Sequence, residues 1–130
     1  MALPLRTISE ANARGSWHGR ARRAKALRGA SRMAVEPRVG AYRRSLAPGA
    51  MGSVVVTLER LAPSPGLDDD NLRAALKAVR DGVADALGLS SDRDPRVTWL
   101  YAQADSRALV RAGVAPMLVR GYGVRVRVED

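Results

Sequence analysis

The feature that most constrains the fold is an amphipathic segment at residues 71–88, which lies between segments with strand-like alternation. Apolar residues recur in it at spacings of three and four, which places them on one face of an α-helix. They are Leu72, Ala75, Leu76, Val79, Val83, Ala86 and Leu87. Gly88 is a candidate for the glycine that ends this helix. Such a helix must bury its apolar face against another layer of structure.

Period-2 alternation with β-branched residues predicts strands at residues 54–61, 97–103 and 121–130. A second helix is predicted at residues 19–33, which are rich in strong helix formers. Its thin apolar stripe consists of Ala21, Ala24, Leu27 and Ala30. Residues 45–53 indicate a loop, and residues 104–119 fit either a short helix or a loop. We therefore expect an α/β (α+β) fold: a small mixed sheet of three to four strands packed against the amphipathic helix, with an additional N-terminal basic helix.

The charge of the chain is unevenly distributed. The 130 residues have a formal net charge of +9. Residues 1–50 hold eleven Lys and Arg against two acids, whereas residues 51–130 hold eleven of each. We expect one domain over residues 1–130, in which 1–50 contacts a polyanion and 51–130 forms a neutral body.

Several protein classes are excluded by composition. The absence of Cys excludes a disulfide scaffold, a thiolate zinc site, an iron–sulfur cluster and a cysteine nucleophile. No apolar run approaches the ~20 residues of a membrane span, and the first residues lack a secretory signal. We expect a soluble, cytoplasmic protein with no membrane partner.

Aspartates gather around the amphipathic segment. Asp68, Asp69 and Asp70 stand where it begins, as expected for a helix N-cap with favourable dipole electrostatics. In an extended segment Asp68 and Asp70 would also point to the same side, so that both could reach one Mg²⁺ or Mn²⁺ ion. A second pair, Asp92 and Asp94, precedes the strand at residue 97, and both pairs are expected to open at the same end of the sheet. Residue spacing alone leaves the metal site and the capping aspartates equally open.

The order of these residues resembles the RusA family of Holliday junction resolvases. The resemblance is carried by Asp68-x-Asp70-Asn71-Leu72, by a helix with Lys77, Asp81 and Gly88, and by Asp94-x-x-Val97. It is specific over residues 67–103 and looser over the preceding strand and residues 9–28. The family implies a small mixed α/β homodimer that binds four-way DNA junctions and cuts two strands with Mg²⁺. Its acidic triad carries over onto Asp68, Asp70 and Asp94.

The chain departs from the family pattern at two places. Family members often have adjacent aspartates at the second site, whereas Arg93 separates Asp92 from Asp94 here, so either can be the third ligand. The family lysine falls on Ala74, and Lys77, two turns after Asp70, is the candidate to contact the scissile phosphate. The alternative for Lys77 is an i,i+4 ion pair with Asp81. Asp92 or Asp69 would orient a metal-bound water.

The resemblance implies a crossover junction endodeoxyribonuclease: a Mg²⁺-dependent (Mn²⁺ as a possible substitute), structure-selective enzyme of DNA recombination and repair. We expect a bacterial or phage-derived homodimer without a small-molecule cofactor. The branched DNA would be held by basic residues of the N-terminal helix, namely Arg20, Arg22, Arg23, Lys25 and Arg28. Trp17 and Tyr42 would either stack on unpaired bases or anchor loops onto the core. The alternatives are a non-catalytic DNA- or RNA-binding protein whose aspartates are structural caps and, less simply, an organelle transit peptide at the N-terminus.

Overall fold

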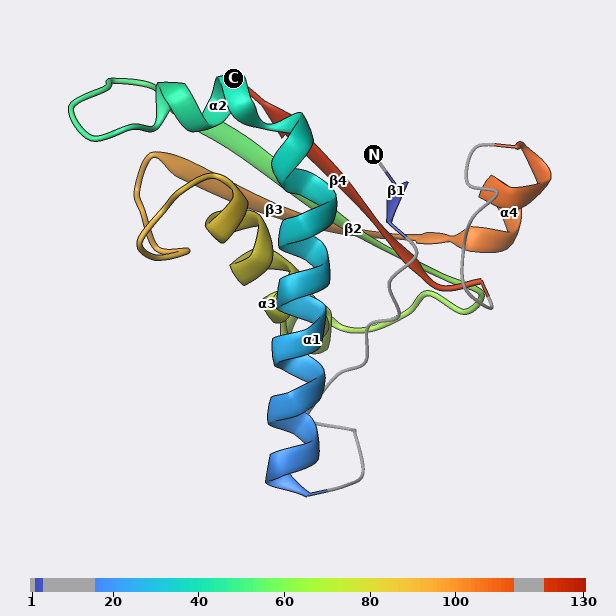
Figure 1. Ribbon diagram of the computed structural model, residues 1–130. Helices are drawn as coiled ribbons and strands as arrows, with labels where there is room; N and C mark the ends of the chain where they lie inside the picture. The colour runs from blue at the N-terminus through green and yellow to red at the C-terminus, as the bar shows by residue number, and fades with distance from the viewer. Residues whose placement is uncertain (1, 4–15, 114–120) are drawn as a thin grey trace.

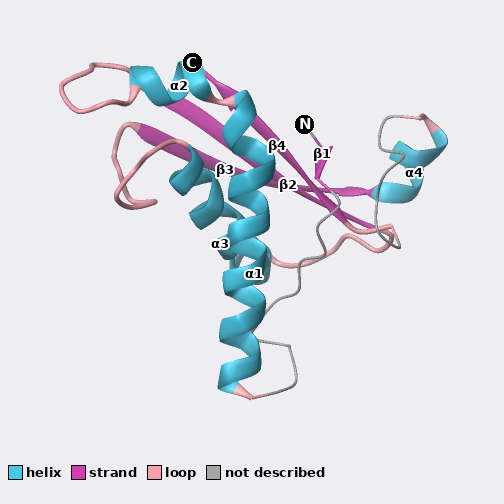
Figure 2. Ribbon diagram, in the orientation of Figure 1, coloured by secondary structure: helices cyan, strands magenta, loops and turns pink. Residues whose placement is uncertain are grey.

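The computed structural model describes residues 2–3, 16–113 and 121–130 (Figure 2). Its elements in chain order are β1 (Ala2–Leu3), α1 (Trp17–Val35), the 3₁₀ helix η1 (Glu36–Arg38), α2 (Gly40–Ser45), β2 (Val54–Ala62), α3 (Asp69–Ala86), β3 (Val97–Asp105), α4 (Ser106–Arg111) and β4 (Gly123–Glu129). The predicted mixed sheet, its amphipathic helix and the basic N-terminal helix are confirmed. The short helices η1 and α2 were not predicted, because so few residues carry no readable periodicity. α4 corresponds to the helix alternative predicted for residues 104–119, of which 114–119 lie outside the described residues.

The sheet has the strand order β1-β4-β2-β3 (Figure 1). β2 and β3 are parallel, in register from Val54 opposite Val97 to Ala62 opposite Asp105, and α3 connects them. β4 runs antiparallel to β2 on its other side, and the two-residue β1 pairs with β4. In a parallel pair joined by a helix, the helix begins after the carboxyl end of the first strand and ends before the amino end of the second. The N-terminal end of α3 therefore follows one end of the sheet, and its C-terminal end precedes the opposite end.

The core lies between one face of the sheet and the helices. Val54, Val56 and Leu58 of β2 are fully buried, whereas Val55 and Thr57, which point to the other face, are half-buried. All seven apolar residues predicted for the buried face of α3 are buried. The prediction that Gly88 ends this helix is confirmed: it has φ +74°, and the amide of Leu89 donates to the carbonyl of Ala84 at 3.0 Å.

α1 packs along α3 through small side chains. A Cβ atom at Gly82 of α3 would overlap the carbonyl oxygen of Arg28 and lie 2.7 Å from Cβ of Ser31. Ser31 itself is fully buried and donates to the carbonyl of Leu27 at 2.7 Å. A glycine at position 82 is unfavourable in an isolated helix, but here it allows the two helix backbones to approach closely.

The predicted apolar stripe of α1 is wrong over most of its length. Ala21, Ala24 and Ala30 are exposed, and the helix buries Ser31 and Val35 instead. The reason is that only the C-terminal half of α1 lies against α3, while its N-terminal end extends away from the sheet (Figure 1). No residue between Trp17 and Ala26 is buried. Within the described part of the chain, no helix has the length and apolarity that a membrane crossing needs.

Candidate functional site

The three consecutive aspartates form the N-terminal end of α3. Asp68 is the N-cap, and its Oδ1 accepts a hydrogen bond from the amide of Asn71 at 2.9 Å. Asp69 and Asp70 lie in the first turn, with exposed side chains. Carboxylates at this position satisfy free amides and interact favourably with the helix dipole. The capping interpretation therefore accounts for Asp68 without a ligand.

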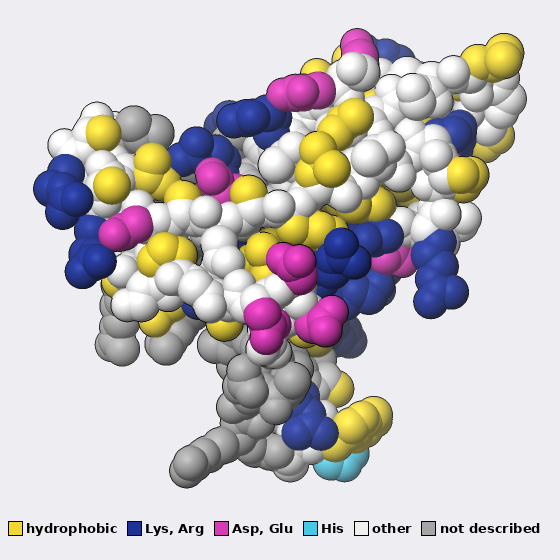
Figure 3. Space-filling view, turned by 180° about the vertical axis from the view of Figure 1, so that it is seen from behind, with side chains coloured by type: hydrophobic (Ala, Val, Ile, Leu, Met, Phe, Trp, Pro, Cys, Tyr) yellow, Lys and Arg dark blue, Asp and Glu magenta, His cyan; other side chains and the backbone are white. Residues whose placement is uncertain are grey.

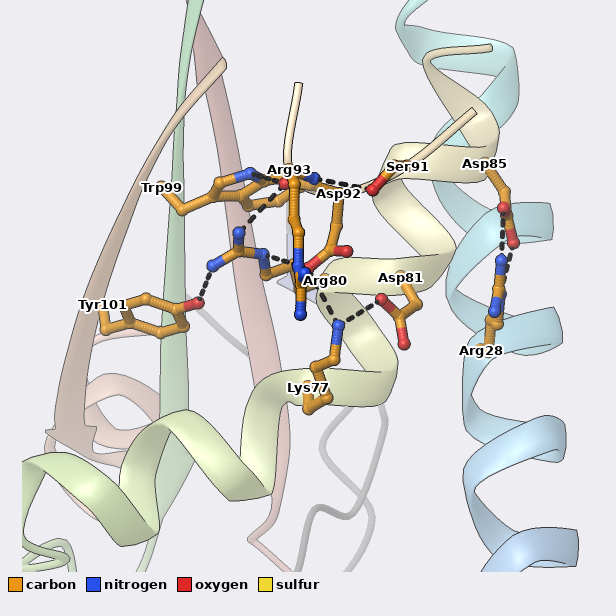
Figure 4. A network of polar contacts seen from close by, with 10 residues as sticks. All are labelled: Arg28, Lys77, Arg80, Asp81, Asp85, Ser91, Asp92, Arg93, Trp99 and Tyr101. Carbon is orange, nitrogen blue, oxygen red and sulfur yellow. Dashed lines mark hydrogen bonds and ion pairs between the residues drawn. The ribbon is translucent and has the colours of Figure 1, made fainter. Parts of the chain in front are cut away.

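Asp92 lies in a network of charged and aromatic side chains between α3 and β3 (Figure 4). Nζ of Lys77 is 2.8 Å from Oδ1 of Asp81 and 2.8 Å from Oδ2 of Asp92. Nε of Arg80 is also 2.8 Å from Oδ2 of Asp92. The bond from Lys77 holds the pKa of the Asp92 carboxyl below its ordinary value, although partial burial acts in the opposite direction. Burial opposes the charge of Lys77, but its bonds to both carboxylates outweigh it and raise the lysine pKa.

Arg80 extends this network onto β3. Its guanidinium lies over the Trp99 ring at 4.8 Å from the centroid, and Nη1 donates to the Tyr101 hydroxyl at 2.7 Å. The backbone carbonyl of Asp92 accepts from Nη2 of Arg80 and from Nε1 of Trp99, each at 2.9 Å. These bonds attach the loop before β3 to the helix. Sequence reasoning did not predict that Arg80, Trp99 and Tyr101 form one group. Two signals were present: Arg80 follows Lys77 by about one helical turn, and Trp99 and Tyr101 are two residues apart in a strand and so lie on the same face of β3.

Asp94 stabilises the turn that leads into β3. Its carboxylate accepts from the backbone amide of Arg96 at 3.0 Å and from the guanidinium of the same residue at 2.8 Å. These bonds with Arg96 lower the pKa of Asp94 to about 2. The Asp94 carboxylate is therefore paired with the guanidinium of Arg96.

The two aspartate pairs do not meet at one end of the sheet, which corrects that expectation. Asp68 and Asp70 follow the carboxyl end of β2, whereas Asp92 and Asp94 precede the amino end of the parallel strand β3. Lys77, the partner of Asp92, lies nine residues after Asp68, or about 13 Å along the helix axis. Among the described residues, no three His, Asp or Glu side chains are grouped so that they could hold a metal ion. The four predicted carboxylates, as placed here, do not fit a Mg²⁺ site.

Arg28, one of the five predicted DNA-binding residues, connects α1 to α3. Its Nε and Nη2 donate to the two carboxylate oxygens of Asp85 at 2.7 and 2.8 Å. This two-point contact raises the pKa of Arg28 and lowers the pKa of Asp85. Bidentate pairs of this kind fix geometry as well as charge. Arg28 therefore positions the basic helix on the body.

The other predicted cations lie on the part of α1 that extends from the body. Arg22, Arg23 and Lys25 are exposed, and Arg20 is half-buried. Seen from behind, the lower tip of the molecule shows Lys or Arg, apolar side chains and the single histidine among its described residues, with the acidic groups higher on the body (Figure 3). The N-terminal half of α1 thus presents positive charge.

The structure separates the two aromatic residues of the basic region. Trp17, in the first turn of α1, is 68% exposed, and its ring packs edge-on against His18 with centroids 5.0 Å apart. Tyr42 is half-buried and packs against the hydrophobic core. The anchoring interpretation therefore holds for Tyr42, while Trp17 remains available at the tip of the basic helix.

Comparisons of this chain with family models, with curated proteins and with solved structures found no match. The likeness to RusA resolvases rests on the motif residues alone.

Proposed function

We propose that this protein binds DNA through α1, whose exposed cations contact the phosphate backbone. The observation that carries the proposal is the charge of this helix together with its position. α1 holds six Lys and Arg and no acid, and the half that extends from the body contains no buried residue. Helices of this composition contact nucleic acid largely through phosphate oxygens, so affinity depends strongly on salt.

Among the described residues, α1 forms ion pairs with acids at Arg28 and Arg32, both in its C-terminal half. Asp81 and Asp92 are paired with Lys77, and Asp94 is paired with Arg96. Asp85 takes up Arg28, the α1 cation that serves as the anchor. Arg22 and Lys25 lie beyond this contact, on the exposed part of the helix. Six of the eleven Lys and Arg of residues 1–50 therefore lie on α1, and Arg22 and Lys25 stand on its protruding part.

Removing two of these cations is expected to weaken binding mainly at low salt. The double variant Arg22→Ala with Lys25→Ala loses two phosphate contacts, so the slope of log K against log[salt] should become shallower by about 2. Fluorescence anisotropy with labelled duplex DNA at several salt concentrations measures this slope. The matched control is Arg93→Ala with Arg111→Ala, which removes the same charge from exposed residues outside α1. An equal change of slope in both double variants would contradict a role for α1.

Trp17 is expected to add a preference for unpaired bases. An aromatic ring beside cations can stack on a base, and such a stack contributes about 1–3 kcal/mol. Trp17→Leu should weaken binding of a single-stranded oligonucleotide by about tenfold and leave duplex binding nearly unchanged. Met33→Leu, at another exposed apolar residue of the same helix, is the control. Equal loss for single strand and duplex would instead indicate a structural role for Trp17.

Junction cleavage remains a prediction of the RusA resemblance. The geometry favours the binding function because Asp92 and Asp94 are each held by a cation and stand apart from Asp68 and Asp70. One assay, with a four-way DNA junction and Mg²⁺, distinguishes junction cleavage from DNA binding alone. Cutting by the wild type that is lost in Asp70→Asn would establish the nuclease. Binding without cutting, across several metal ions and pH values, would leave the non-catalytic function.

A further inference from the structure

The cations in the N-terminal half of α1 lie on two different flanks of the helix. This half, residues 17–26, contains no buried residue and carries four Lys and Arg without an acid. Arg22 and Lys25 are about one turn apart on one flank. Arg20 and Arg23 are about one turn apart on a second flank, about 160° around the helix from the first. A helix that lies along a single phosphate backbone needs cations on one side only, so this distribution favours a partner with phosphates on both sides.

Between the two flanks, α1 presents small side chains on the side that faces away from α3. Gly19 and Ala26 are seven residues apart, so they lie on one line along the helix, and Met33 continues it. Met33 is 77% exposed, whereas Ser31, about 150° around the helix from this line with Ala24, is buried against α3. The outward line, defined by Gly19 and Ala26, therefore allows a partner to approach the helix backbone closely between two rows of cations.

The dimensions of this half of α1 match the major groove of B-form DNA. An α-helix with its side chains is about 10–12 Å across, and the groove is about 12 Å wide with a phosphate backbone along each edge. Residues 17–26 extend away from the sheet and span about 15 Å, or roughly four base pairs (Figure 1). The minor groove, at about 6 Å, is too narrow for a helix, and the major groove of an RNA duplex is also deep and narrow.

We propose that the N-terminal half of α1 enters the major groove of B-form DNA, with the outward line toward the bases and each flank toward one phosphate backbone. This inference rests on the proposed function, because it specifies the partner and the binding mode of the same helix. Gly19 contributes to the close approach. A Cβ there would lie 3.4 Å from Nη1 of Arg23, so this guanidinium lies beside bare backbone at the edge of the outward line.

Blocking one groove at a time tests this binding mode. Fluorescence anisotropy of the full chain compares three duplexes of one sequence at the same salt concentration: unmodified DNA, RNA, and DNA whose cytosines are replaced by glucosylated 5-hydroxymethylcytosine, which fills the major groove. We expect affinity to fall by about tenfold or more for the modified DNA and for the RNA. Netropsin, which occupies the minor groove at A·T pairs, should not displace the protein from unmodified DNA. Equal affinity for the three duplexes, or displacement by netropsin, would overturn the proposal.

Two leucine substitutions provide a matched comparison within the helix. Ala26→Leu places a bulky side chain on the outward line and should weaken binding of unmodified DNA by about tenfold, since the helix can no longer approach the groove floor. Ala24→Leu makes the same change at an exposed residue on the side that faces α3 and should leave the affinity nearly unchanged. Leucine is a strong helix former, so circular dichroism should show the same helix content in both variants. An equal loss of affinity in both variants would contradict insertion by the outward line.

The same measurements separate failure of this inference from failure of the proposed function. If Arg22→Ala with Lys25→Ala weakens DNA binding while Ala26→Leu and the blocked major groove do not, α1 binds DNA outside the major groove and only the inference is overturned. If that double variant binds as the wild type does, or if the wild type binds none of the three duplexes, both are overturned.

Discussion

Replacing Gly82 by alanine is expected to destabilise the fold by about 2 kcal/mol, although alanine is the better helix former. Alanine in a helix interior is favoured over glycine by about 1 kcal/mol. Here its Cβ would overlap the Arg28 carbonyl and crowd Ser31, and backbone atoms cannot rotate away. α1 would have to move off α3, and overpacking of this kind typically costs about 1–3 kcal/mol. Urea unfolding followed by circular dichroism measures the difference.

Gly29→Ala is the matched control for this prediction. Gly29 lies in the interior of α1, and a Cβ added there meets nothing within 4 Å. The control should therefore gain about 0.5–1 kcal/mol through the ordinary helix preference. Opposite signs for the two substitutions would show that the close crossing exists in solution. Equal stabilisation of both variants would mean that α1 does not cross α3 at Gly82.

Asp92→Asn is expected to destabilise the protein by about 2 kcal/mol at pH 7. The substitution removes the negative charge that Lys77 and Arg80 share, and Arg80 is only 22% exposed in its side chain. Loss of one partner leaves a half-buried cation without compensation, which is the costly part of breaking such a pair. Asp70→Asn is the control, because Asp70 is exposed in the first turn of α3 and should change stability little.

The difference in stability between the wild type and Asp92→Asn is expected to depend on pH. The folded-state pKa of Asp92 is depressed, chiefly by the bond from Lys77, so its contribution is complete above the unfolded pKa of about 4. As pH falls below that value and through the folded pKa, the contribution is lost. The stability gap between wild type and Asp92→Asn should therefore be constant from pH 7 to 5 and close below pH 4. If Asp92 served only to bind metal, Asn would leave stability unchanged and abolish Mg²⁺-dependent cleavage instead.

Periodicity and turn chemistry predicted the main elements because their causes are local. The spacing of Leu72, Val79 and Val83 specifies a one-sided helix, and the prediction of its buried face is confirmed. β2, β3 and β4 follow from alternation in the same way. The stripe on α1 was wrong because a helix buries only the length along which a partner lies, and the position of that partner is not local information.

The candidate site was less predictable than the fold. Spacing indicated that Asp68 and Asp70 lie close to one another, and also that Lys77 can pair with Asp81, which the 2.8 Å contact confirms. It did not indicate that Arg80 would bring Asp92 together with Trp99 and Tyr101. That grouping depends on how the end of α3 and the loop before β3 turn onto the strand.

The sequence by itself determined the class of fold, the buried face of α3 and the concentration of positive charge before residue 50, since each is a property of composition or of short-range spacing. Only the tertiary structure decided which charged side chains are paired within the protein and which are exposed to a partner. The parallel register of β2 and β3 separates the two aspartate pairs, and Asp85 takes up Arg28. The same packing buries Nε and Nη1 of Arg60 without a hydrogen-bond partner among the described residues. Burial and pairing depend on segments distant in the chain, and no local pattern records which of them will meet.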